Sequence, residues 1–133
     1  MSGAVEGLRG RRILVAEDEY MIADELAGVL GEAGAEVVGP VSRVREALDI
    51  VRSGGHLDGA VLDVNLVGEM IWPVAEALTA RGVPVVLATG YDQGAIPADR
   101  ASLPHCQKPV EARVIARALA RSIAASEETA CNP

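Results

Sequence analysis

Acidic side chains stand at the ends of two apolar runs in the chain. Glu17 and Asp18 follow the run ILVA, and Asp63 closes the run AVLD. An aspartate in that position can simply begin a turn, because its side chain bonds nearby backbone groups. If the two runs are neighbouring strands of one sheet, three carboxylates come together, and like charges that close raise one another's pKa unless a cation neutralises them. A hard divalent cation, Mg²⁺ or another such as Mn²⁺, suits these oxygen ligands.

Two further polar residues stand at the ends of later apolar runs. Thr89 ends the run VPVVLAT, and Lys108 follows a short run and precedes Pro109. A lysine supplies a positive charge and a threonine supplies a hydroxyl donor, so together with the carboxylates they describe a pocket for a phosphoryl group. In such a pocket a carboxylate can be the nucleophile and form an aspartyl phosphate. The protein then contributes positioning and charge neutralisation.

Strands and helices alternate along the chain. Buried-strand patterns occupy residues 12–17, 35–41, 57–64 and 83–90 and a short part of 103–109, and helical patterns occupy residues 20–34, 43–55, 73–82 and 110–126. This alternation is typical of a parallel sheet with right-handed crossovers, covered by helices on both faces. Ligands bind such sheets outside the carboxyl ends of the strands. We therefore expect Asp63 to face a site rather than to begin an ordinary turn.

Two connections depart from the regular pattern. We expect residues 65–72 to form a loop, because Pro73 suits only the first turn of the helix that follows. The segment 91–102 contains Gly94 and Pro97, which both oppose a helix interior. A short or mobile fourth helix is expected there.

Length and composition indicate one α/β domain. We expect a flexible N-terminal arm over residues 1–10, a domain over 11–124 and a flexible C-terminal tail over 125–133. The net charge of −7 argues against a nucleic-acid surface. No apolar run approaches the roughly 20 residues of a membrane span. Cys106 and Cys131 form neither a metal pattern nor a disulfide framework. These features predict a cytoplasmic protein.

Four motifs together resemble a known family. The stretches VAEDE, VLDVNL, ATG and QKP, in this order and spacing, resemble the receiver domain of two-component response regulators. The stretches LATGYD, DVNLVGE and WPVAEAL resemble more narrowly the FAT GUY group of alphaproteobacterial receivers. The resemblance covers residues 11–124. It implies a flavodoxin-like fold, with a doubly wound, five-stranded parallel sheet in the order 2-1-3-4-5.

The resemblance also implies a role for each motif residue. Asp63 would be the phosphoacceptor, and its partners would be a sensor histidine kinase or a histidine phosphotransfer protein. The protein would not be an enzyme beyond catalysing its own phosphorylation and dephosphorylation. The other implied roles are direct Mg²⁺ binding by Asp18, water-mediated binding by Glu17, metal binding by the main-chain carbonyl of Asn65, and phosphoryl contacts from Thr89 and Lys108.

Three positions differ from the usual receiver pattern. Glu17 stands where most receivers have an aspartate, and Val67 stands where they have a proline. His105 takes the place of the switch aromatic. Tyr91 lies two residues after Thr89, and residues two apart in an extended segment share a side. We therefore hypothesise that Tyr91 replaces the missing aromatic, with His105 as the other candidate.

Two other functions and two minor features stay open at this point. A metal-dependent phosphatase-like enzyme would usually carry its nucleophile on the first strand, and a pseudo-receiver would bind partners without phosphorylation. A stand-alone receiver is the favoured interpretation.

Glu19 is interpreted as a first-turn acid favoured by the helix dipole. The stripe of Arg113, Arg117 and Arg121 is either a solvated helix face or a docking surface for an acidic partner.

Overall fold

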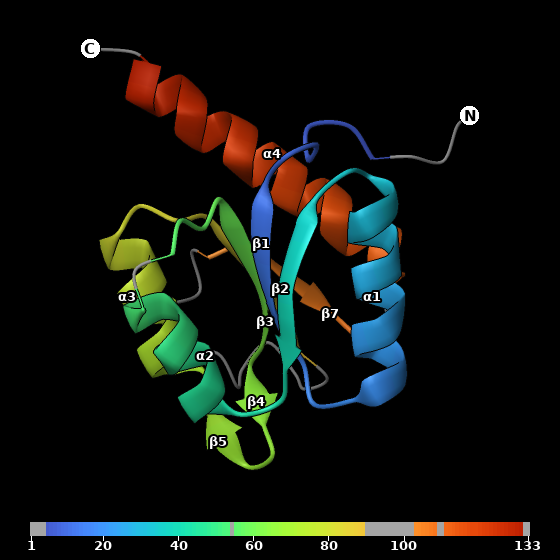
Figure 1. Cartoon of the computed structure of the whole chain (residues 1–133), viewed down its shortest axis with the longest axis vertical. Coiled ribbons are helices and arrows are strands. Elements are labelled where there is room, and N and C mark those ends of the chain that lie inside the picture. The colour runs from blue at the N-terminus through green and yellow to red at the C-terminus, as the bar shows by residue number, and fades with distance from the viewer. Residues whose placement is uncertain (1–4, 54, 90–102, 109–110, 132–133) are drawn as a thin grey trace.

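A five-stranded parallel sheet forms the centre of the molecule (Figure 1). The computed structural model describes residues 5–53, 55–89, 103–108 and 111–131. The strands of the sheet are β1 (Arg12–Ala16), β2 (Glu36–Val41), β3 (Gly59–Asp63), β6 (Val85–Thr89) and β7 (His105–Gln107). Their spatial order is β2-β1-β3-β6-β7, with every neighbouring pair parallel. The prediction of a flavodoxin-like sheet in the order 2-1-3-4-5 is confirmed.

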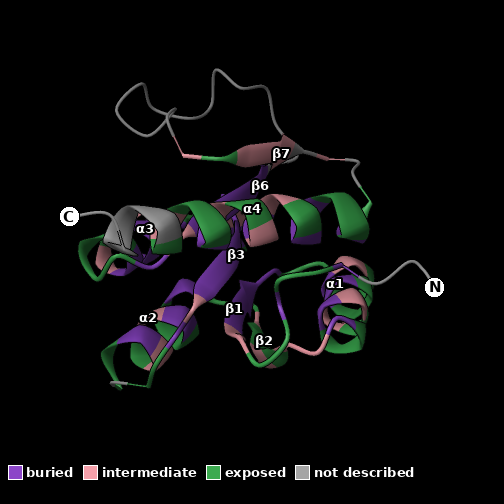
Figure 2. Ribbon diagram, turned by 90° about the horizontal axis from the view of Figure 1, so that it is seen from above, coloured by how far each residue is buried: buried purple, intermediate pink, exposed green. Residues whose placement is uncertain are grey.

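Helices cover both faces of the sheet (Figures 1 and 2). Helices α1 (Tyr20–Glu32) and α4 (Ala112–Cys131) pack together on one face, and α2 (Val44–Arg52) and α3 (Trp72–Ala80) pack together on the other. Each pair of helices buries its own apolar cluster against the strands. All five residues of β3 are buried, as expected for a central strand with helices on both sides.

The strand register brings the carboxyl ends of β1, β3 and β6 to one level. Ala16 of β1 lies beside Leu62 of β3, and Asp63 lies beside Ala88 of β6. Glu17 follows Ala16, so it leaves β1 at the height of Asp63. Parallel strands thus collect at one edge residues that are far apart in the sequence.

A small hairpin forms where the sequence predicted a plain loop. Strands β4 (Asn65–Leu66) and β5 (Glu69–Met70) pair antiparallel directly after β3. The turn between them has φ of +50° at Val67 and +87° at Gly68, which is the pattern of a type I′ hairpin turn. Valine is rare at positive φ, because its branched Cβ crowds the backbone. The sequence therefore gave little sign of this turn.

The N-terminal segment packs on the domain from residue 5 onward. Val5 and Leu8 are buried in the apolar cluster beneath α1 and α4. The Gly10 amide donates to the Gly34 carbonyl at 2.8 Å, which ties the segment to the end of α1. The prediction of a loose arm was therefore wrong for residues 5–10, because two apolar side chains in a glycine-rich stretch find a place in the core.

Other predictions concern the C-terminal part of the chain. Helix α4 continues to Cys131, whereas a flexible tail was expected from residue 125. The expected fourth helix, with Gly94 and Pro97, and the candidate switch residue Tyr91 lie outside the described residues. None of the helices in the described part is both long and apolar enough to cross a membrane.

The packing of the N-terminal segment can be tested by truncating Leu8. The side chain is fully buried, so Leu8→Ala is expected to lower the free energy of unfolding by about 2–5 kcal/mol through lost burial and a cavity. Urea unfolding measures the change. Met21→Ala is the control, since Met21 is 82% exposed and should change stability by less than about 0.5 kcal/mol. Equal, small effects of both substitutions would show that residues 5–10 do not contribute to the core.

Candidate functional site

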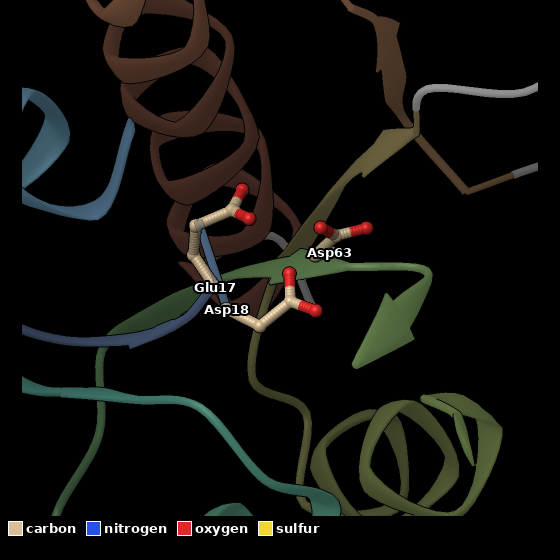
Figure 3. Close-up of side chains that lie close together, drawn as sticks. All are labelled: Glu17, Asp18 and Asp63. Atoms are coloured by element: carbon tan, nitrogen blue, oxygen red, sulfur yellow. The ribbon is translucent and has the colours of Figure 1, made fainter. Parts of the chain in front are cut away.

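Three carboxylates converge at the carboxyl ends of β1 and β3. Figure 3 shows the side chains of Glu17, Asp18 and Asp63 together there, and one oxygen from each lies within 4.8 Å of the others. Glu17 and Asp63 are buried, whereas Asp18 is exposed. The structure thus brings together the three acids that the sequence singled out.

Lys108 lies against these carboxylates from the end of β7. Its Nζ atom is 2.9 Å from Glu17 Oε1, 2.9 Å from Asp63 Oδ2 and 3.1 Å from Glu19 Oε1. It is also the only lysine in the chain, which has eleven arginines. An ammonium group has three donors on one compact centre, whereas a guanidinium is a planar fork. The lysine can therefore donate to three carboxylates that approach it from different directions.

Glu19 makes a contact that its sequence position did not predict. It was interpreted as a first-turn acid, but it is the N-cap residue of α1 and its carboxylate pairs with Lys108. Its backbone N–H donates to Glu17 Oε2 at 3.1 Å. The only signal in the sequence was its position directly after Asp18, which does not distinguish a helix-capping acid from a lysine partner.

Burial and charge set the protonation of the cluster. Burial raises the pKa of Glu17 to about 7, and the neighbouring Asp63 carboxylate adds to the rise while Lys108 opposes it. Burial by itself lowers the pKa of Lys108, but hydrogen bonds to Glu17 and Asp63 outweigh it and raise this pKa above its usual value. The lysine therefore stays charged at neutral pH, and Glu17 can exchange a proton there.

Backbone amides of the hairpin donate further hydrogen bonds to the carboxylates. The Asn65 N–H donates to Asp63 Oδ1 at 3.1 Å, and the Val67 N–H donates to Asp18 Oδ2 at 2.9 Å. The Gly68 N–H donates to the Asn65 side-chain oxygen at 2.8 Å. A proline at position 67 has no N–H and cannot reach a φ of +50°. The departure from the usual proline therefore has a structural counterpart in this turn.

For the side chains of the remaining predicted site residues, the structure gives no hydrogen bond with the carboxylate cluster among the residues that it describes. Thr89 is the last residue of β6, beside the site, but its side chain lies outside the described part of the structure. His105 is half-buried on the edge strand β7, and its Nδ1 is 3.1 Å from the Leu103 carbonyl oxygen. The His105 ring thus contacts the backbone just before its own strand, and this hydrogen bond does not involve the carboxylate cluster. The roles proposed for Thr89, His105 and the Asn65 carbonyl stay predictions.

The donor set fits a hard divalent cation. Three carboxylate oxygens within 4.8 Å of one another provide oxygen ligands, and Mg²⁺ commonly takes one or two carboxylates and completes its shell with water and phosphate oxygens. The exposed Asp18 leaves one side of the cluster open to solvent. Asp18 and Asp63 would hold the ion directly, and the buried Glu17 would hold it through water.

Comparisons with known proteins agree with this geometry. No family model matches the chain. The solution structure of SdrG from Sphingomonas melonis Fr1 is 38% identical, covers 96% of this chain and 99% of its own, and has a TM-score of 0.72. The crystal structure of a response regulator receiver protein from Sinorhizobium medicae WSM419 is 24% identical, covers 88% and 97%, and has a TM-score of 0.74.

A curated relative matches over a shorter stretch. The transcriptional regulatory protein PdtaR of Mycobacterium tuberculosis (strain CDC 1551 / Oshkosh) is 33% identical over 84 residues, which are 62% of this chain and 40% of that protein. The matched stretch thus spans less than half of the relative's length. Fold, site and the near-complete match to SdrG define the class of protein. The chain belongs to the response regulator receiver domains.

Binding of Mg²⁺ should depend on pH through Glu17. With a folded-state pKa of about 7, against an ordinary value of 4.5, Glu17 carries more negative charge at pH 8 than at pH 6. We expect Mg²⁺ to raise the melting temperature, and its apparent affinity to increase about tenfold from pH 6 to pH 8 as the competing proton leaves. Thermal unfolding at a series of Mg²⁺ concentrations measures both.

Two substitutions and one control test which residues bind Mg²⁺ and which residue makes the binding depend on pH. Asp18→Asn should abolish the Mg²⁺-dependent gain, whereas Asp49→Asn removes the same charge from the exposed side of α2 and should leave it unchanged. Glu17→Gln should flatten the dependence on pH. A melting temperature that rises with Mg²⁺ in Asp18→Asn as in the parent would show that the metal binds elsewhere.

Proposed function

We propose that the chain is a response regulator receiver that accepts a phosphoryl group on Asp63 from a phosphohistidine donor, with Mg²⁺ bound, and signals by a change of conformation. The observation that carries this proposal is the setting of the Asp63 carboxylate. It is held between the Lys108 ammonium and the Asn65 amide, beside two further carboxylates at the carboxyl edge of the sheet. The FAT GUY group and a cytoplasmic location belong to the same proposal.

Each residue of the site would have its own role in phosphoryl transfer. A carboxylate oxygen of Asp63 attacks phosphorus, the phosphorus–nitrogen bond of the donor breaks, and the imidazole leaves with the electron pair. Bound Mg²⁺ supplies neutralisation of the charge on the phosphoryl oxygens. Lys108 already pairs with Asp63 and would also pair with a phosphoryl oxygen. The Thr89 hydroxyl would donate to a second oxygen, and Tyr91 would then transmit the change.

The surface around the site suits a protein donor. Within the described residues, four of the five large exposed apolar side chains lie on elements that border the carboxylates: Tyr20 and Met21 at the start of α1, and Val67 and Met70 in the hairpin. Exposed apolar groups that surround a polar centre are typical of protein-interaction sites. A histidine kinase or a histidine phosphotransfer protein can therefore dock with its phosphohistidine above Asp63.

Incubation with acetyl phosphate and Mg²⁺ tests the proposal. Intact-mass spectrometry should show the addition of one phosphoryl group, and peptide mapping should place it on Asp63. Asp63→Asn should abolish the addition, and Asp49→Asn should retain it. Turnover of acetyl phosphate without accumulation of the phosphorylated protein would instead indicate a phosphatase-like enzyme. No reaction of the parent protein in the presence of Mg²⁺ would contradict the proposal and favour a phosphorylation-independent binding module.

A further inference from the structure

The hairpin turn contacts Asp18, the exposed one of the three carboxylates that could hold a metal ion. The Val67 N–H donates to Asp18 Oδ2 at 2.9 Å, across 49 positions of sequence. Glu17 and Asp63 are buried and both pair with Lys108. Asp18 is exposed, and among the residues that the structure describes its carboxylate has this one hydrogen bond. Without the Val67 amide, Asp18 would be free to rotate toward solvent.

We propose that the Val67 backbone amide is a positioning group for metal binding, because it holds one oxygen of Asp18 and so orients the other toward the cation. This inference rests on the proposed metal site and adds a residue that the motif comparison does not assign. A carboxylate has two oxygens, so one can accept an N–H while the other binds a metal. Hydrogen-bonded partners of metal ligands commonly change metal affinity by about 10- to 100-fold when they are lost.

The unusual backbone of the turn supports this role. Val67 has a φ of +50°, a conformation that a β-branched residue rarely adopts. In this conformation its N–H donates to Asp18. The same turn is tied to the opposite carboxylate, since the Gly68 N–H donates to Asn65 Oδ1 and the Asn65 N–H donates to Asp63 Oδ1. The hairpin therefore links the ends of β1 and β3 and fixes the distance between two metal ligands.

The amide can be removed without changing the side chain. Replacement of the amide of Val67 by an ester, through the corresponding hydroxy acid in a semisynthetic protein, deletes the N–H and keeps the turn and the isopropyl group. We expect the dissociation constant for Mg²⁺, measured by calorimetry, to increase about tenfold or more. The matched control is Val67→Gly, which keeps the N–H and suits a positive φ, and should bind Mg²⁺ within about twofold of the parent.

A second readout needs no metal. In the metal-free protein, Asp18→Ala should accelerate hydrogen exchange at the Val67 amide, since it removes the acceptor. Unchanged exchange, or unchanged Mg²⁺ affinity of the ester variant, would overturn the positioning role while leaving the metal site in place. If Val67→Gly weakened binding as much as the ester, the side chain rather than the amide would be responsible, and the proposal would be wrong. Absence of Mg²⁺ binding by the parent would overturn the metal site and the positioning role together.

Discussion

The contact between the Lys108 ammonium and the carboxylates around it is the interaction on which the site depends. Two of those carboxylates, Glu17 and Asp63, are buried, and an unpaired buried charge costs several kcal/mol. With both oxygens at 2.9 Å from one nitrogen, the lysine neutralises repulsion that would otherwise oppose the close approach of β1 and β3. In the proposed phosphoryl transfer, this single compact charge would also be shared with the incoming phosphoryl group.

The order of the strands makes this contact possible. Lys108 leaves the sheet at its β7 edge, and β6 lies between β7 and β3. The long lysine side chain reaches past β6 to the ends of β3 and β1, because all of these strands run parallel and finish at one edge. The hairpin β4–β5 adds backbone amides, which donate to Asp18 and Asp63. The Asp63 carboxylate is thus held by the lysine at one oxygen and by the Asn65 amide at the other.

The sequence predicted the elements with strong local signals. Buried apolar runs marked the five strands of the sheet, and polar residues at their ends indicated which edge carries the chemistry. Glu17, Asp18, Asp63 and Lys108 lie together as expected. The combination of short motifs, rather than any one of them, indicated the receiver family, which the comparisons support.

The features that the sequence did not predict depend on tertiary contacts. The hairpin turn places a valine at positive φ, against its local preference, and long-range hydrogen bonds such as the one to Asp18 hold it. Residues 5–10 looked like a loose arm, because only the folded domain offers Val5 and Leu8 a place to be buried. The pairing of Glu19 with Lys108 spans 89 positions, and no local pattern encodes it.

Replacing Lys108 tests the central claim most directly. In metal-free solution at pH 8, Lys108→Met should lower the free energy of unfolding by about 3–5 kcal/mol, because it leaves buried carboxylates unpaired. The loss should shrink as the pH falls to 6, since Glu17, with its pKa of about 7 in the parent, then takes up a proton in the folded state. Lys108→Arg keeps the charge and should recover part of the stability. A Lys108→Met variant as stable as the parent at pH 8, with the same dependence on pH, would contradict the account.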